Sequence, residues 1–280
     1  MIPLYNGSMN ISKLKKNPKI FARIFGIDPE KFDKLVAEVR PLWIKAEEKR
    51  LKHSRKIKKG SGRKYLLNLE EMIAMLLLYV RAYVTHAFLS ALFDVHHSAI
   101  CRHFARLRPS VESVFDLPTR KTDLSEEEIL QLVVDATEQR TERRKKGCGY
   151  SGKKKAHTVK TQIVVDKKGN IIHISKSVPG NIHDKKLFDK SKVKLPDNAK
   201  GDLGYLGTKI TIPIKASKLH PLTQKQKDRN KRFSKKRIVV EHVLASLKAY
   251  RILADRFRGS LANYHQYFLI ACGLRNLARS

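Results

Sequence analysis

The chain has 280 residues, and its 59 Lys and Arg against 26 Asp and Glu give a formal net charge of +33. A hydrophobic fraction of 41% supports a folded core, while the charge excess favours a polyanionic partner, for which nucleic acid is the strongest candidate. No apolar segment approaches the roughly 18 residues that span a bilayer, no signal peptide opens the chain, and the three scattered cysteines form no CxxC pair. We therefore expect a cytoplasmic protein with reduced thiols and neither a membrane partner nor a zinc site.

Basic runs punctuate the chain and indicate where it meets that polyanion. They cover residues 49–64, 140–155, 225–237 and, more weakly, 251–258. The first run contains Gly-Ser-Gly and almost no apolar residues, so it predicts an exposed linker. We accordingly separate an N-terminal helical and basic segment, residues 1–65, from the rest of the chain.

Residues 66–108 show helical periodicity and predict a small all-α domain, to which we assign residues 66–122. Two short helices, in "THAFLSALF" and "SAICRHFARL", are separated by the tight break "DVHH". Ile100, Phe104 and Leu107 fall on one face of the second helix. This is the pattern of a helix-turn-helix. The opposite face, predicted to be outward and DNA-binding, carries four polar residues: Ser98, Arg102, His103 and Arg106.

Residues 123–280 predict a second domain of mixed α/β class. Strand-like runs occupy 132–134, 158–165 and 171–178, and a short helix comes next at 184–190. Two further short strands flank "GDLGYLG", and a long helix covers roughly 224–253, with a last amphipathic helix at 261–277. This order of elements is typical of an RNase H-like sheet.

Three acids occupy distinctive places in this otherwise basic domain. Asp135 ends the first predicted strand, Asp202 ends a later one, and Glu241 lies inside the long helix. Ligand groups gather beyond strand ends, so the aspartates converge if their strands are neighbours, and the helix can deliver Glu241. Offsets of four and seven residues put Arg237, Glu241 and Lys248 within about 40° on one helix face. An ordinary Arg–Glu surface pair would produce the same spacing.

Clustered carboxylates predict a metal site. Two like charges about 4 Å apart repel by about 4 kcal/mol at an effective dielectric near 20, so the cluster needs a cation. Oxygen ligands select hard ions, and we expect two Mg²⁺ or Mn²⁺ ions held by Asp135, Asp202 and Glu241. Such a pair clamps the attacking and leaving oxygens of a phosphodiester displacement. Arg143 and Arg144, just after the first strand, and Lys153 and Lys154 would then hold DNA phosphates.

The blocks "VVDATEQR", "YSGKKKAHTVKTQIVVD", "PGNIHD", "GDLGYLG" and "RIVVEHVLASLKAYRIL" make the family resemblance. In this order they resemble bacterial DDE transposases of the insertion-sequence-five (IS-five), Harbinger-like type, which also carry a helix-turn-helix ahead of the catalytic domain. The resemblance implies an RNase H-like fold and a catalytic triad of Asp135, Asp202 and Glu241. It also implies a bacterial, nucleoid-associated protein.

The resemblance extends to residues around the triad. Arg237 and Lys248 match an Arg-x3-Glu-x6-Lys pattern of related transposases, which implies that both contact DNA. Ser234 stands where a Tyr often precedes that Arg. Lys155 and His157 match as DNA contacts or supports of the ligands, and Asp184 as a supporting acid.

The implied function is metal-dependent cleavage and strand transfer at the terminal inverted repeats of an insertion sequence. The partners are those double-stranded repeats and the target DNA, bound by a dimer or a higher homo-oligomer. Two alternatives stay open: a transposase-derived DNA-binding protein without catalysis, and a nuclease without strand transfer.

Overall fold

A computed structural model describes residues 9–54, 65–115, 117, 133–142, 149–191, 199–216 and 221–280. The chain forms two compact units. The first contains Met1–Asp116, Tyr250–Ile252 and Gln266–Ser280, and the second contains Leu117–Ala249 and Leu253–His265. Within the described ranges, none of the helices has the length and apolar composition needed to cross a membrane.

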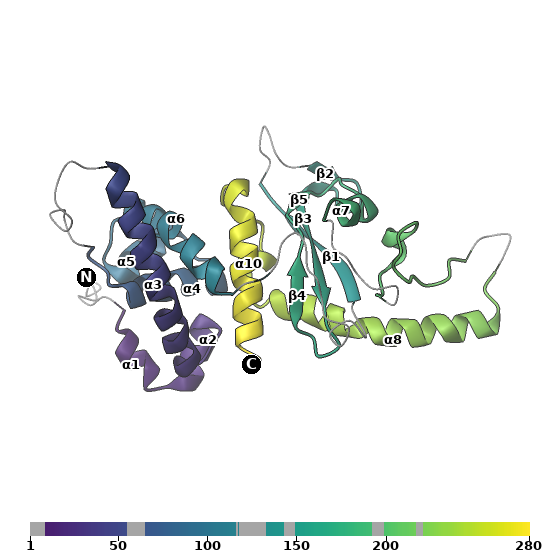
Figure 1. Ribbon diagram of the computed structural model, residues 1–280, viewed down its shortest axis with the longest axis horizontal. Coiled ribbons are helices and arrows are strands. Elements are labelled where there is room, and N and C mark those ends of the chain that lie inside the picture. The colour runs from purple at the N-terminus through teal and green to yellow at the C-terminus, as the bar shows by residue number, and fades with distance from the viewer. Residues whose placement is uncertain are drawn as a thin grey trace, which may run out of the picture. The chain divides into compact units, whose positions relative to one another are not determined.

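The first unit is helical (Figure 1). Its helices are α1 (Ile11–Lys15), α2 (Pro18–Phe25), α3 (Pro29–Ser54), α4 (Leu69–Ala82), α5 (His86–Phe93) and α6 (His97–Val114). Asn68 caps α4 through a reciprocal capping box with Glu71, and ten residues of α4 are buried, so α4 is the central helix of this unit. α3 packs against both α4 and α6, so the segment predicted to stand apart before residue 66 shares this unit.

The helix-turn-helix prediction is confirmed in position. Thr85 caps α5, and Asp94 ends it in the left-handed region at φ 49°. α6 begins only three residues later, with His96 at its N-cap. Ile100, Phe104 and Leu107 are buried, as their spacing predicts.

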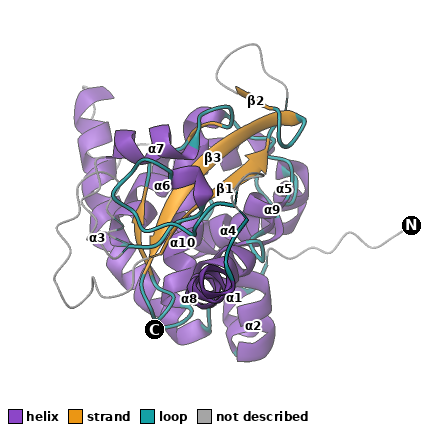
Figure 2. Ribbon diagram, turned by 90° about the vertical axis from the view of Figure 1, so that its right-hand side faces the viewer, coloured by secondary structure: helices purple, strands orange, loops and turns teal. Residues whose placement is uncertain are grey.

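The second unit is built on an antiparallel sheet (Figure 2). Its strands are β1 (Val133–Arg140), β2 (Gly149–Ser151), β3 (Ala156–Val165), β4 (Ile171–Ile174) and β5 (Val178–Pro179). The central strand β3 pairs with all four others. Helix α7 (Asp184–Ser191), the 3-10 turn η2 (Leu203–Tyr205) and α8 (Gln224–Leu247) complete the unit. The mixed α/β architecture of this unit, which follows the helix-turn-helix region in the chain, is consistent with an RNase H-like fold.

The predicted strand at 132–134 continues through Asp135 instead of ending on it. β1 runs to Arg140, and Asp135 lies opposite Ile163 of β3. Pairing along the whole length of β1 overrides the low intrinsic strand preference of aspartate. The long helix is shorter than predicted, because α8 ends at Leu247 and a separate short helix, α9 (Arg251–Ala254), comes after it.

The C-terminal helix α10 (Leu261–Leu277) has the predicted bounds but a different association. Residues Gln266–Ser280 belong to the helical unit, whereas the prediction assigned 123–280 to one sheet domain. Tyr267 explains this, because its ring lies 5.6 Å from that of Tyr79 and 4.7 Å from the Arg108 guanidinium. An amphipathic helix packs against whichever core accepts its apolar face, and periodicity alone does not identify that core.

Candidate active site and DNA-binding surfaces

A parallel backbone bridge brings the first two predicted acids together. Val133 pairs in parallel with Lys200, and the Val134 N–H donates to Lys200 O at 2.8 Å. Continuing that register by two residues sets Asp135 beside Asp202. Asp202 ends its segment by capping η2, since its Oδ1 accepts the Gly204 N–H at 2.8 Å.

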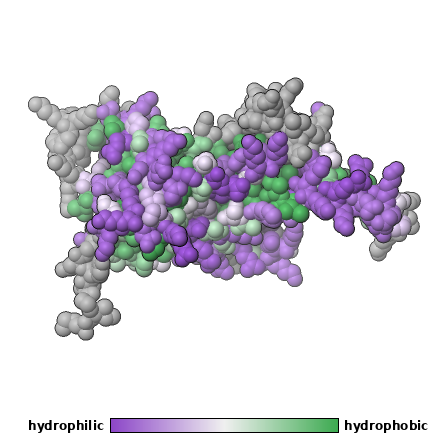
Figure 3. Space-filling view, turned by 90° about the horizontal axis from the view of Figure 1, so that it is seen from below, coloured by the Kyte–Doolittle hydropathy of each residue, from purple (hydrophilic) through white to green (hydrophobic). Residues whose placement is uncertain are grey.

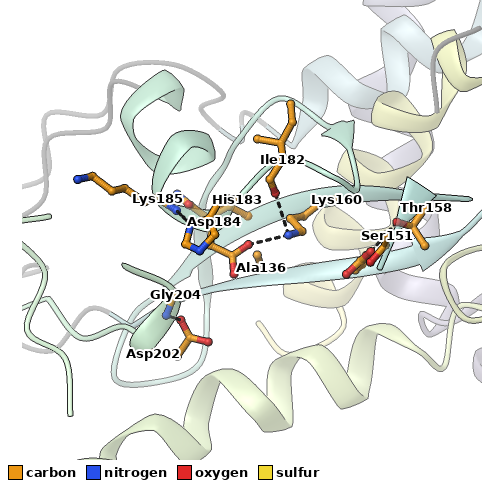
Figure 4. A network of polar contacts seen from close by, with 12 residues as sticks. Ala136, Ser151, Thr158, Lys160, Ile182, His183, Asp184, Lys185, Asp202 and Gly204 are labelled. Atoms are coloured by element: carbon orange, nitrogen blue, oxygen red, sulfur yellow. Dashed lines mark hydrogen bonds and ion pairs between the residues drawn. The ribbon is translucent and has the colours of Figure 1, made fainter. Parts of the chain in front are cut away.

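A third carboxylate comes from the first turn of α7. A Cβ placed on Gly204 would lie 2.8 Å from Asp184 Oδ2 and 2.9 Å from Asp202 Oδ1, so glycine lets both carboxylates approach one point (Figure 4). Beneath them, Tyr205 is fully buried with Val134 and Val164 in one apolar cluster. That cluster fixes the turn that carries Asp202.

The three aspartates share one cavity of about 270 Å³. Its other lining residues are Ala136, Thr137, Glu138, Lys153, Lys154, Lys160, Leu244 and Lys248. The predicted phosphate-binding residues Lys153, Lys154 and Lys248 are exposed there, beside the acids. The structure therefore gathers carboxylates and exposed ammonium groups around the same hollow.

Two cations balance the carboxylates from within the unit. Lys160 Nζ lies 2.9 Å from Asp184 Oδ1 and also donates to Ile182 O at 2.9 Å (Figure 4). Arg237 Nη2 lies 3.6 Å from Asp135 Oδ2, and Arg237 Nε is buried without a hydrogen-bond partner. Arg237, which the resemblance implies as a DNA contact, is half-buried beside Asp135. It reaches Asp135 because α8 packs on β1.

The carboxyl of Asp135 has a strongly raised pKa. Burial raises the pKa of its carboxyl to about 6, against the lowering effects of the Ala136 N–H and Arg237. The charges of Asp202 and Asp184 raise this pKa further. A carboxyl held at such a pKa is costly to ionise without a bound cation, as expected of a functional site.

Glu241 is not brought to this cavity. It is exposed, and it is absent from the lining, although Leu244 one turn further along α8 is present. Among the described residues, no group of three or more His, Cys, Asp or Glu side chains is arranged to hold a metal ion. The oxygen-only donors Asp135, Asp202 and Asp184 nevertheless suit a hard divalent cation. Lys160 pairs with Asp184 and Arg237 pairs with Asp135, so these two cations lie against carboxylate oxygens that could otherwise bind a metal ion.

Lys160 and Glu138 were missed from the sequence. Glu138 Oε1 accepts the Thr158 hydroxyl at 2.5 Å. Lys160 pairs opposite Glu138 and is the one charged residue inside the apolar run 158–165. A lone lysine in a buried strand requires a partner, and that was the signal available for finding it.

The remaining predicted contacts around the sheet lie in different surroundings. Lys155 is exposed with φ 46°, and His157 is half-buried with its ring 5.6 Å from that of Tyr150. Arg143 and Arg144 lie outside the described residues.

The outward placement predicted for His103 on α6 is wrong. His103 is only 6% exposed, and its ring packs 5.5 Å from that of Tyr65, which covers this edge of α6. Arg106 is half-buried and donates to the Tyr65 hydroxyl at 2.9 Å. Ser98 is half-buried, so Arg102 is the most exposed of the four predicted contacts.

Comparisons with known proteins agree with this combination of an acidic cavity and a helix-turn-helix. The model of the DDE superfamily endonuclease family matches residues 134–276, and the model for the helix-turn-helix of DDE superfamily endonucleases matches residues 65–113. The chain belongs to the DDE superfamily endonucleases. Members of this superfamily generally use divalent metal ions.

Two relatives resemble the chain over nearly its whole length. One is a probable transposase for insertion sequence element IS702 of Microchaete diplosiphon, with 35% identity covering 96% of this chain and 95% of the relative. The other is assigned as a transposase for insertion sequence element IS112 of Streptomyces albus G, with 28% identity covering 93% and 95%. No solved structure matches the chain significantly.

Arg102 provides a test of the helix-turn-helix surface. We expect Arg102→Ala to weaken binding to a DNA duplex and to reduce the slope of log K against log salt by about one, if it contacts a phosphate. Arg40→Ala is the matched control, because Arg40 is an exposed arginine on α3, outside the helix-turn-helix. Fluorescence anisotropy across a salt series measures the DNA affinity of both variants. Equal losses of affinity in the two variants would contradict the assignment of Arg102 to the DNA-binding surface.

Proposed function

We propose that the protein is an insertion-sequence transposase of the IS-five, Harbinger-like type. It cleaves DNA at the terminal inverted repeats of its own element and transfers the strand to target DNA. The proposal is supported above all by Asp135 and Asp202, which lie side by side in a cavity bordered by exposed lysines. Near-full-length similarity to two insertion-sequence transposases supports it independently.

Within the proposal, Asp135 and Asp202 hold one or two Mg²⁺ or Mn²⁺ ions, with Glu241 as the third acid. When bound, such ions supply Lewis-acid stabilisation of an in-line phosphodiester displacement. The rim residues Lys153, Lys154 and Lys248 hold the DNA backbone against the acidic cavity. Two DNA ends must be held together for strand transfer, so the working form is a dimer or a higher oligomer.

Two side chains compete for the position of the third acid, Glu241 on α8 and Asp184 on α7. Glu241 lies three residues before the cavity residue Leu244, on the same helix face as Arg237. Its carboxylate reaches the aspartates only if its rotamer changes or α8 moves towards β1. Asp184 already points into the cavity but is paired with Lys160.

The experiment uses a supercoiled plasmid that carries the inverted repeats of the element, with Mg²⁺ or Mn²⁺. Wild type should produce cleavage at the repeat ends and joined products. We expect Asp202→Asn and Glu241→Gln each to abolish both products, and Asp184→Asn to lower them by about 10-fold to 100-fold, as for a group that orients ligands. The control is Asp189→Asn, because Asp189 is an exposed acid on α7 outside the cavity.

The outcomes separate the candidate functions. Ends that are bound but never cut would favour a DNA-binding protein derived from a transposase. Cleavage without joined products would favour a nuclease. Wild-type cleavage by Glu241→Gln, together with none by Asp184→Asn, would reassign the third acid to Asp184.

A further inference from the structure

The N-terminal half of α8 borders a second, larger cavity in the sheet unit. This cavity has a volume of about 650 Å³. Five cations line it: Lys200, Lys225, Arg229, Arg232 and Lys236. Ile214, Thr223, Gln226 and Phe233 complete the lining, which among the described residues includes no acid.

Hydrogen bonds hold the walls of this cavity in place. Thr223 and Gln226 form a capping box that sets the start of α8. Asn230 then ties the opposite wall to the helix, because its side chain donates to Ile214 O and accepts from Ile214 N, both at 2.9 Å. Arg229, Arg232 and Lys236 recur at three- and four-residue spacing, so they point to the same side of α8.

A cavity with this lining suits a chain of phosphates. Five positive groups gathered in one hollow repel one another, and a polyanion relieves that repulsion while its counterions are released. Phe233 adds an aromatic wall against which a sugar or a base can pack. The surface of this part of α8, at the right of Figure 3, is almost continuously hydrophilic.

The position of this cavity along α8 relates it to the aspartate cavity. Arg237, which pairs with Asp135, comes directly after Lys236, so a single helix runs past both cavities. Arg229 and Arg232 lie eight and five residues before Arg237, which corresponds to about 8–12 Å along the helix axis. At 3.4 Å per base step, this is about two to four steps of DNA.

We propose that this cavity, named the α8 basic cavity for Lys200, Lys225, Arg229, Arg232 and Lys236, binds the DNA backbone about two to four nucleotides from the phosphate that is cleaved at the aspartate cavity. This inference rests on the proposed function for the position of the cleaved phosphate. The cavity thereby fixes the direction in which the strand crosses the aspartates. A contact on only one side of the cut gives the protein a means of distinguishing the end of the element from its flank.

The test compares two sets of charge removals on one helix. The cavity variant carries Lys225→Gln, Arg229→Gln and Arg232→Gln. The control variant carries Lys227→Gln, Lys231→Gln and Lys235→Gln, which remove the same charge from exposed positions of α8 that do not line the cavity. All six side chains are exposed, so both variants should keep the wild-type melting temperature.

Binding is measured by fluorescence anisotropy in EDTA, with a labelled duplex that carries one terminal inverted repeat and its flank. We expect the salt slope of the cavity variant to fall by about two to three, against less than about one for the control. A series of duplexes with one neutral methylphosphonate each locates the contact. Neutralising a phosphate two to four steps from the cut, on one side, should weaken wild type and leave the cavity variant unchanged.

The assignment would be overturned if the cavity and control variants lost the same amount of salt slope. It would also be overturned if no methylphosphonate position affected wild type and the cavity variant differently. If the triple variant did not fold, the single pair Arg232→Gln and Lys231→Gln would give the same comparison. The binding readout requires no cleavage, so the two proposals fail separately. If the cavity variant binds DNA more weakly but wild type does not cleave, only the proposed transposase reaction is contradicted. If wild type cleaves normally but the cavity variant binds DNA as wild type does, only the role of the α8 basic cavity is contradicted.

Discussion

Asp135→Asn is expected to abolish cleavage and, at the same time, to stabilise the metal-free protein at neutral pH. The catalytic loss should exceed about 100-fold, since replacing even a group that orients a metal ligand costs about 10-fold to 100-fold. Asparagine keeps the oxygen that accepts the Ala136 N–H at 2.8 Å, so the fold of β1 should be preserved. The gain in stability arises because the variant no longer buries a carboxylate.

The sign of the pH dependence is set by the raised pKa. The folded protein holds a proton on Asp135 up to about pH 6, whereas the unfolded chain releases it near the ordinary aspartate pKa of 3.8. The free energy of unfolding therefore falls as pH rises from about 4 to about 6. Above that range Asp135 is ionised in both states, and the loss of stability is complete. A difference of about two pKa units corresponds to at most about 3 kcal/mol.

Thermal unfolding in EDTA at pH 5 and pH 7.5 measures this effect. Asp135→Asn should melt several degrees above wild type at pH 7.5, with a smaller difference at pH 5. Asp189→Asn, which alters an exposed acid on α7, should match wild type at both pH values. A variant of Asp135 that melts below wild type at pH 7.5 would show that Arg237 fully compensates the buried charge.

Gly204→Ala should inactivate the enzyme from a position that bears no functional group. The added Cβ would lie within 3 Å of oxygens from both Asp184 and Asp202, closer than real Cβ contacts. The carboxylates must separate or the turn must shift, and displacement by about 1 Å can cost about 100-fold in rate. Overpacking of this kind also costs about 1–3 kcal/mol of stability.

Gly152→Ala is the control, because a Cβ there meets nothing within 4 Å. Plasmid cleavage and Mn²⁺ binding by calorimetry report the two effects of Gly204→Ala separately. We expect weaker Mn²⁺ binding and slower cleavage for Gly204→Ala, and wild-type values for Gly152→Ala. Normal Mn²⁺ binding by Gly204→Ala would exclude Asp202 and Asp184 as neighbouring ligands at the proposed metal site.

Local patterns in the amino-acid sequence are enough to predict much of this protein. The helix-turn-helix could be predicted because Ile100, Phe104 and Leu107 repeat on one face and the short break "DVHH" precedes them. Asp135 and Asp202 stood out because isolated acids beside apolar runs are rare in a chain of net charge +33. Both patterns are local, so they can be recognised whatever the tertiary arrangement of the other elements.

Long-range packing selects which side chains meet. Asp135 joins Asp202 only because 133 and 200 pair in parallel, a register that no local pattern encodes. Lys160 and Asp184, 24 residues apart in the chain, pair at the cavity, while Glu241 is exposed and does not line it. His103 became buried because Tyr65 covers it. Periodicity fixes the face of a helix or strand, but the element that covers that face is chosen by the tertiary fold.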